Sequence, residues 1–294
     1  MIEFKLNRYV KRCVLMLLFT LLHQSCVKTL TDEDDFILQD GGKELQIHLN
    51  SGVSLKNATT SIHMNKVKKM TITGVLGGHS LAFLRGLAGG DNSNYLAECN
   101  LGELNIEMCL FTSGEEVYYN RNGVDLKISA LSGSTGIPPY AFENCYSLNT
   151  VVLPRNTHKI GKGAFKDCLL LRYILWGKKV KNIEEDAFNG CSTLALGEPL
   201  ILPEGLEYIS DRAFMETILS SVELPSTIEY IGENAFSPIF NNVVIRATNP
   251  PVIKETSFVF DKTSDKVLYV PMESVENYKI EPYLSIFNEI KSIE

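Results

Sequence analysis

The apolar positions in the second half of the chain recur at a fixed spacing. Ala-Phe pairs begin, in steps of 23, 23, 26 and 22 residues, at Ala141, Ala164, Ala187, Ala213 and Ala235. A weaker copy follows at Ser257-Phe258. After each Phe the other apolar residues return in register, and in the first repeat they are Leu148, Val151, Leu153 and Ile160. One repeat cannot bury such a set alone, so neighbouring repeats must stack and share a core.

Each repeat predicts the same short elements. The Val-x-Leu triplets, such as Val151 to Leu153, alternate with period two and predict short parallel strands. The Ala-Phe segments are too short for full helices and predict single helical turns, with Ala where backbones crowd. A period in the low twenties is typical of a leucine-rich-repeat solenoid. We therefore predict a mainly β fold with short helical turns, built from stacked 22–26-residue coils with N- and C-terminal caps.

The repeated motif I-G-x-x-A-F-x-x-C-x-x-L-x-x-V-x-L-P resembles that of the BspA-like family of bacterial surface leucine-rich-repeat proteins. The resemblance covers about 130–294, with 243–258 similar to the family's last repeat and 267–293 to its C-terminal cap. Residues 66–75 and 103–110 resemble irregular N-terminal repeats. Trp176-Gly177 stands where Leu-Pro is usual, and the last two Ala-Phe copies lack the Cys. The resemblance implies a binding protein at the cell surface.

The first residues carry a targeting pattern. A basic stretch from Lys5 to Arg12 precedes an apolar run at 13–22, which is ten residues long. A helix that spans a bilayer needs about 20 residues, so the run predicts a signal peptide. Ser25-Cys26 resembles the end of a bacterial lipobox, which implies cleavage before Cys26 and its lipidation. The alternative is ordinary secretory cleavage. The acidic run Asp32–Asp35 is either an outer-surface export signal or a solvated linker.

These patterns predict five segments along the chain. They are a signal peptide at 1–25, a lipidated Cys and acidic tether at 26–35, an N-terminal cap with irregular repeats at 36–135, regular repeats at 136–260, and a C-terminal cap at 261–294. Residues 79–90 (HSLAFLRGLAGG) predict a short amphipathic helix that ends at Gly89-Gly90.

The net charge and the absence of catalytic or metal-binding motifs in the sequence reduce the number of possible functions. The net charge of −7 disfavours nucleic acid, because phosphate binding needs Lys and Arg. Basic residues concentrate in the early repeats and acidic residues in the later ones, which predicts a charge gradient along the stack. The histidines form no catalytic motif, and no spacing indicates a zinc site, a phosphate loop or another cofactor. We therefore predict no enzyme, no metal and no cofactor.

The cysteines have structural interpretations. Cys145, Cys168 and Cys191 share one repeat position, three residues after each Phe, and are expected to stack inward as buried thiols. The sequence leaves open whether Cys99 and Cys109 pair.

The middle residue of each Val-x-Leu strand is expected to face solvent. This column, with Tyr173 beside it and two tyrosines of a further column, forms the candidate binding surface: Val152, Tyr173, Leu175, Ile201, Glu223, Val244, Tyr208 and Tyr230. An exposed apolar stripe can mark an interaction site. We predict a lipid-anchored outer-membrane protein, displayed at the cell surface, that binds a protein or mediates adhesion. The alternatives are a glycan-binding accessory protein of a polysaccharide uptake system, a periplasmic scaffold, and a secreted form.

Overall fold

The computed structural model describes residues 36–90, 101–129, 136–239, 242–260 and 266–293. The predicted signal peptide, Cys26, the acidic tether and Cys99 lie outside these residues. Contacts divide the chain into Met1–Asp34 and Asp35–Glu294, and all of the described residues belong to the second unit.

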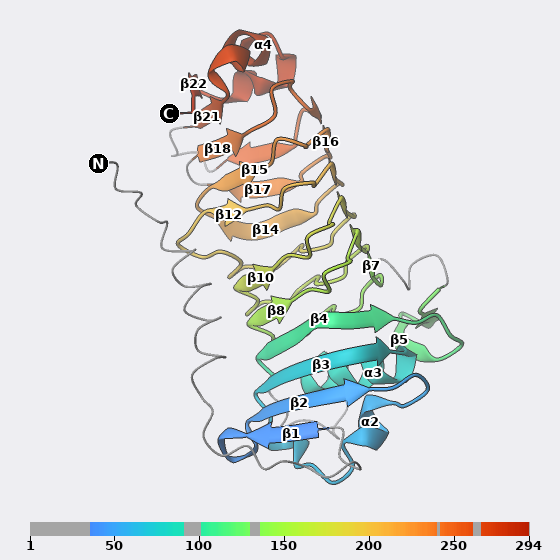
Figure 1. The fold of residues 1–294 in the computed structure, drawn as a ribbon. Coiled ribbons are helices and arrows are strands. Elements are labelled where there is room, and N and C mark those ends of the chain that lie inside the picture. The colour runs from blue at the N-terminus through green and yellow to red at the C-terminus, as the bar shows by residue number, and fades with distance from the viewer. Residues whose placement is uncertain (1–35, 91–100, 130–135, 240–241, 261–265, 294) are drawn as a thin grey trace. The chain divides into compact units, whose positions relative to one another are not determined.

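The first sheet joins the N-terminal region to the first two regular repeats (Figure 1). Its strands, in spatial order, are β1 (Phe36–Gln39), β2 (Glu44–Leu49), β3 (Lys69–Leu76), β4 (Glu103–Phe111), β8 (Thr150–Val152) and β10 (Tyr173–Leu175). Only β1 and β2 pair antiparallel, and every later pair is parallel. The register between β4 and β8 places Leu104 opposite Val151. The two irregular segments therefore share a parallel sheet with the regular repeats.

A second parallel sheet runs through the connectors between repeats. Its strands, of two residues each, are β7 (Gly136–Ile137), β9 (Lys159–Ile160), β11 (Asn182–Ile183), β13 (Tyr208–Ile209), β16 (Tyr230–Ile231) and β19 (Val252–Ile253). The isoleucine of each strand is buried, and the residue before it is at least partly exposed in every strand except β7, where Gly136 is buried. Sequence analysis predicted the buried isoleucines but not that the connectors pair as a sheet.

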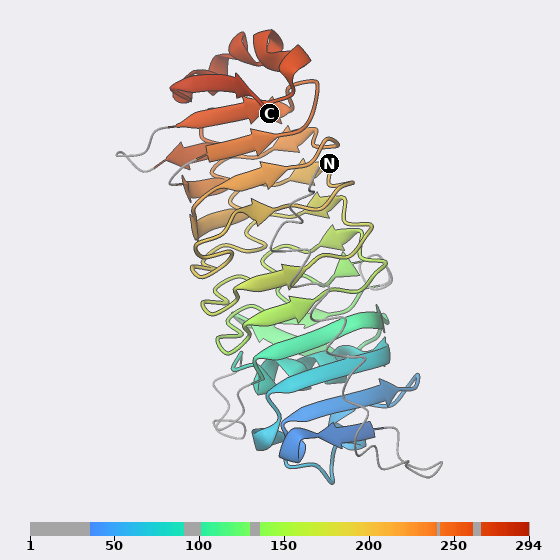
Figure 2. The same ribbon diagram turned by 60° about the vertical axis from the view of Figure 1, so that its left-hand side comes forward.

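The remaining strands belong to the later repeats, which follow one another in the view of Figure 2. A third parallel sheet contains β12 (Leu200–Ile201), β15 (Val222–Leu224), β18 (Asn242–Ile245), β21 (Val267–Val270) and β22 (Glu289–Ser292). A fourth contains β14 (Phe214–Leu219), β17 (Phe236–Ile239) and β20 (Phe258–Phe260). An antiparallel hairpin joins β5 (Val117–Arg121) to β6 (Val124–Lys127).

Helices are few and short in the described residues. The α-helices are α2 (Leu55–Ala58), α3 (Gly78–Leu87) and α4 (Val275–Lys279). The 3-10 helices are η1 (Asp40–Gly42), η2 (Met64–Lys66), η3 (Met272–Ser274) and η4 (Pro282–Ile286). The predicted helix near 79–90 is confirmed as α3, and Gly89 follows it with a φ of 78°. A left-handed glycine of this kind is a common way to end a helix.

The helical turns expected at the Ala-Phe pairs are only partly confirmed. In the first three repeats the chain makes hydrogen-bonded turns, in which the Cys N–H bonds the carbonyl of the Phe three residues earlier. In the later repeats the prediction of helical turns is wrong, because the same position holds the strands of the fourth sheet. The change coincides with the loss of the Cys. In the fourth repeat Thr217 replaces it and its hydroxyl donates to the Phe214 carbonyl, a local bond that competes with helical geometry.

An unusual backbone conformation recurs around each Ala-Phe pair. The residue before the alanine has a positive φ of 52–59° in all five copies, and these residues are Tyr140, Gly163, Asp186, Arg212 and Asn234. The residue two after the Phe is also left-handed in the first four copies. Between these positions, the Phe N–H of each of the first four copies donates to the alanine carbonyl of the next repeat, as from Phe165 to Ala187 at 2.8 Å, and the Phe236 N–H donates to the Ser257 carbonyl. Backbone hydrogen bonds at the Ala-Phe pairs thus join successive repeats, in addition to the hydrogen bonds of the parallel sheets.

The phenylalanines of these pairs form the centre of the core. Six rings stack from one repeat to the next, with centroids 5.2–5.6 Å apart, and they belong to Phe142, Phe165, Phe188, Phe214, Phe236 and Phe258. The alanine beside each of the first five rings is fully buried, which leaves room for the close backbone contact. The periodic side chains therefore build one continuous core.

Candidate binding surfaces

The outward column of the Val-x-Leu strands forms a surface that we call the strand stripe: Val152, Leu175, Ile201, Glu223 and Val244. Leu175 is 36% exposed and Ile201 is 38% exposed, whereas the other three are half-buried. Glu223 accepts a hydrogen bond from Arg246 Nε at 2.6 Å, so its carboxylate is already paired. The two exposed aliphatic residues are therefore the parts of the stripe most available to a partner.

The strand stripe crosses a break between two sheets. Leu175 lies on β10, the last strand of the first sheet, and Ile201 lies on β12, the first strand of the third sheet. The Trp176 indole N–H donates to the Ile201 carbonyl at 3.2 Å, so a side chain joins the two repeats where the ladder is interrupted. The break coincides with the extra residues of the third repeat around Gly197.

Sequence analysis missed an apolar cluster beside this break. Its side chains, each 41–53% exposed, are those of Tyr146, Leu169, Leu170 and Leu196. Hydrogen bonds hold their segments together, because Thr193 donates to the Leu169 carbonyl and Arg172 to the Leu196 carbonyl. The sequence carried a signal, since the second repeat has Leu169-Leu170 where the first has Tyr146-Ser147 and the third has Ser192-Thr193. We call this cluster, together with Leu175 and Ile201, the apolar patch.

The two tyrosines of the candidate surface lie on a different sheet. Tyr208 on β13 and Tyr230 on β16 are paired in register on the second sheet, whereas Tyr173 lies on β10 of the first. Tyr208 is 42% exposed, and its hydroxyl donates to Glu229 Oε2 at 2.7 Å. The eight candidate residues thus belong to three different sheets.

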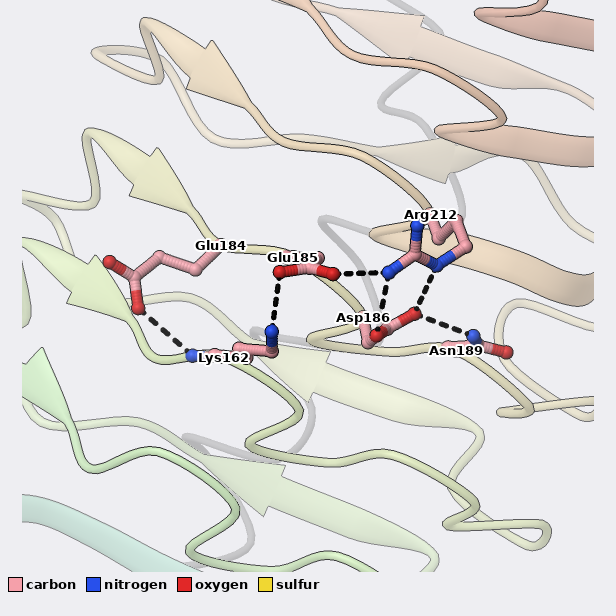
Figure 3. A network of polar contacts seen from close by, with 6 residues as sticks. All are labelled: Lys162, Glu184, Glu185, Asp186, Asn189 and Arg212. Atoms are coloured by element: carbon pink, nitrogen blue, oxygen red, sulfur yellow. Dashed lines mark hydrogen bonds and ion pairs between the residues drawn. The ribbon is translucent and has the colours of Figure 1, made fainter.

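A polar network joins three successive repeats at the ends of the second-sheet strands (Figure 3). Glu185 accepts hydrogen bonds from Lys162 Nζ, at 2.6 Å, and from Arg212. Arg212 Nε also binds Asp186 Oδ1 at 2.9 Å, and Asn189 donates to the same oxygen at 2.8 Å. Every carboxylate here meets a cation, so the network stabilises the contact between repeats and leaves no carboxylate free to act as a base.

The network shifts the pKa of its acids downward. The hydrogen bond from Lys162 is the main reason that the pKa of Glu185 is lowered. Burial raises the pKa of Asp186, but hydrogen bonds from Arg212 and Asn189 outweigh it and hold that pKa below its usual range. Carboxylates with lowered pKa values stabilise the fold above their unfolded pKa values, which are about 4. That stabilisation is lost as the pH falls through the folded-state pKa values.

We expect Arg212→Gln to lower the free energy of unfolding by about 1 kcal/mol at pH 7, the upper range for partly exposed pairs. The loss is expected to be smaller near pH 3, where about four-fifths or more of unpaired carboxyls are protonated. Urea unfolding at both pH values measures it. Lys279→Gln is the control, because its pair with Glu276 is exposed and lies within one helix. An equal loss at both pH values would contradict a role through Glu185 and Asp186.

Comparison with known proteins identifies the repeats. A family described as the BspA type leucine rich repeat region matches six copies, over residues 92–195 and 195–282. The chain belongs to this family. No curated protein matches the chain.

Solved structures similar to this BspA-type chain come from several bacteria. The pneumococcal vaccine antigen PcpA is 15% identical, with 85% of this chain and 67% of that one covered and a TM-score of 0.43. A leucine-rich repeat protein of T. pallidum is 16% identical, with 90% and 98% covered and a TM-score of 0.31. One from Bacteroides ovatus is 12% identical, with 91% and 77% covered and a TM-score of 0.26.

The cysteines of the BspA-type repeats pack inward, as predicted. Cys145, Cys168 and Cys191 are fully buried, and the Cys168 thiol donates to the Phe142 carbonyl at 2.9 Å. Burial raises the pKa of Cys168 and Cys191, which keeps both thiols protonated and unreactive. Cys109 is also a free buried thiol, and burial raises its pKa to about 12.

In the part of the chain that the structure describes, no group of three or more His, Cys, Asp or Glu side chains is placed to hold a metal ion. None of the helices in those ranges has the length and hydropathy to cross a membrane.

Proposed function

We propose that this BspA-type protein is a non-enzymatic, lipid-anchored cell-surface protein that binds another protein, or mediates adhesion, through the apolar patch. The observation that carries the proposal is that two adjoining repeats expose five aliphatic side chains. Leu169, Leu170, Leu175, Leu196 and Ile201 are each at least 36% exposed and belong to adjoining repeats. Exposed apolar clusters are uncommon away from interaction sites, and removing them from water favours association.

The setting of the patch supports a protein partner more than a sugar. Sugar binding uses flat aromatic faces. Trp176, however, packs edge-on against Phe188, with ring centroids 5.6 Å apart, and its indole N–H donates to the Ile201 carbonyl. The patch is instead mainly aliphatic, with Tyr146 as its aromatic member. An apolar side chain of a partner protein can pack against such a surface without making hydrogen bonds.

The proposed location at the cell surface is supported by the N-terminal sequence and by the family. The basic stretch, the short apolar run and Ser25-Cys26 support export and lipidation at Cys26. Two acyl chains hold a protein stably on a membrane, whereas one is marginal. On this proposal Cys26→Ser releases the protein from the membrane, and external protease cuts the parent protein on intact cells.

We expect Leu175→Asp to reduce adhesion of cells that display the protein at least tenfold, since a buried unpaired charge costs more than about 1.4 kcal/mol. The measurement is attachment to immobilised host matrix proteins and to partner cells, with the surface level normalised by protease shaving. Leu175 is already 36% exposed, so thermal stability is expected to stay close to that of the parent.

Ile280→Asp is the matched control, because Ile280 is 79% exposed and lies beyond α4 in the sequence, far from the patch residues along the chain. Full attachment by the Leu175→Asp variant would refute the apolar patch as the binding site. Protection of the parent from protease on intact cells would refute surface display.

A further inference from the structure

The second sheet carries a motif that appears twice and that the apolar patch does not use. The third and fourth connectors read Glu207-Tyr208-Ile209-Ser210-Asp211 and Glu229-Tyr230-Ile231-Gly232-Glu233. Each places a tyrosine on a strand, an acid immediately before it and a second acid three residues after it. The strands β13 and β16 pair in parallel, with Tyr208 directly opposite Tyr230, so the two motifs lie in register. Val252 continues the outward column on β19 and is 61% exposed.

The column of Tyr208, Tyr230 and Val252, which we call the tyrosine row, lies outside the core. Tyr208 is 42% exposed and Tyr230 is half-buried, while the isoleucine after each is fully buried. Paired strands lie about 4.8 Å apart, so the two tyrosines occupy adjacent positions of the column. The hydrogen bond from the Tyr208 hydroxyl to Glu229 fixes the first ring beside a carboxylate of the next repeat.

The acids around the tyrosine row are mostly uncompensated. Glu207 pairs with Lys181 Nζ at 2.5 Å. Asp211, Glu229 and Glu233 have no ion-pair partner within the described ranges, and the Asp211 carboxylate accepts a hydrogen bond from the backbone N–H of Glu233. Residues 203–256 contain eight acidic and three basic residues, and one of the three, Arg212, is held by Glu185 and Asp186. The field at this end of the sheet is therefore negative.

The same column is basic at the other end of the sheet. The first connector reads His158-Lys159-Ile160-Gly161-Lys162, so lysines occupy positions that hold tyrosine and acids later on. Sheet geometry is the same in both places, because β9, β11, β13 and β16 share one register. The tyrosines and acids are thus a property of two repeats, and the fold does not require them.

We propose that the tyrosine row binds an extended, arginine- or lysine-rich segment of a partner protein. An arginine over a tyrosine face is attracted by the ring, and the flanking carboxylates add charge-assisted hydrogen bonds. A basic segment that crosses β13 and β16 meets two rings and three uncompensated acids. This site is separate from the apolar patch and does not depend on the function proposed for that patch.

The test uses the complete purified chain and fluorescein-labelled nona-arginine, followed by fluorescence anisotropy at about 50 mM salt, where screening is weak. Tyr208→Ala is expected to weaken binding about two- to fivefold, and the Tyr208→Ala/Tyr230→Ala double variant about tenfold, as for exposed cation–π contacts. Tyr208→Phe keeps the ring and is expected to bind within about twofold of the parent.

Two matched variants distinguish a site from general attraction. Tyr146 is 44% exposed and lies in the apolar patch, so Tyr146→Ala is expected to bind nona-arginine as the parent does. Leu175→Asp is also expected to retain binding, which separates this result from any failure of the patch. Nona-glutamate is expected not to bind.

Three outcomes would overturn the proposal. Unchanged binding by the double variant would mean that net charge alone attracts the peptide. An equal loss with Tyr146→Ala would mean that the effect is not local to the tyrosine row. Binding of a neutral oligosaccharide such as cellohexaose, without binding of nona-arginine, would assign the row to sugars.

Discussion

Phe188→Ala is expected to lower the free energy of unfolding by about 3–5 kcal/mol, the usual range for truncating a buried phenylalanine. Phe188 is fully buried, and its ring lies between those of Phe165 and Phe214, with centroids 5.3 and 5.2 Å away. Truncation removes two stacking contacts as well as buried area. It also opens a cavity between repeats that the backbone bonds hold at a fixed spacing, so the neighbours cannot close it.

The measurement for Phe188→Ala is urea unfolding followed by two signals. Trp176 is the only tryptophan and packs edge-on against Phe188, so its fluorescence reports on the altered repeats. Far-ultraviolet circular dichroism reports on the whole chain, and the two signals separate only if repeats unfold independently. Phe188→Leu is the conservative variant, expected to cost less than the alanine change. A loss below about 1 kcal/mol for Phe188→Ala would contradict a central role for the stacked rings.

Arg85→Met is expected to lower the free energy of unfolding by about 3 kcal/mol, because it leaves the buried Ala141 carbonyl without its side-chain donor and removes one of the two donors of the Tyr140 carbonyl. Arg85 lies on α3 and is fully buried. Its Nη1 donates to the carbonyls of Tyr140 at 2.8 Å and Ala141 at 3.2 Å, at the first Ala-Phe pair. The guanidinium carbon also lies 3.7 Å from the centroid of the Tyr119 ring. One side chain thus ties the helix and the β5–β6 hairpin to the first regular repeat.

Chemical denaturation compares the Arg85 variants. Arg85→Lys keeps the charge but cannot reproduce the planar fork of donors, so an intermediate loss is expected. Arg155→Met is the control, since Arg155 is 56% exposed and pairs with Glu107 at the surface. Its loss is expected to stay within about 1 kcal/mol. If Arg85→Met is no less stable than Arg155→Met, the buried guanidinium does not hold the two regions together.

Glu143 extends the same junction and shows why sequence analysis did not find it. The carboxylate is nearly buried and accepts two hydrogen bonds from Arg121 Nε and Nη2, at 2.9 and 3.1 Å. Arg121 also lies over the Tyr140 ring, 4.0 Å from its centroid. In the sequence these residues look like ordinary charged positions of a hairpin and a repeat. Their roles depend on contacts between residues about twenty or more positions apart, which no local pattern encodes.

The strand stripe shows the same limit for the candidate site. Its outward direction followed from the alternation of side chains along a strand, and Leu175 and Ile201 are exposed as that alternation predicts. The assignment of the two to different sheets did not follow, because it depends on how the extra residues of the third repeat alter pairing. Leu169 and Leu170 were not predicted, because a repeat consensus describes the positions that all copies share. It omits residues that occur in one copy only.

The sequence by itself determined the repeat family, the spacing of the coils and the inward columns of Phe, Cys and Ile. These follow from periodicity, because side chains at equivalent positions of equal coils must face the same core. Tertiary structure alone decided that the connectors form a second sheet, that the Ala-Phe segment changes from turn to strand, and that Arg85 is buried at a junction. It also decided which exposed residues gather, since that depends on hydrogen bonds and packing between successive coils.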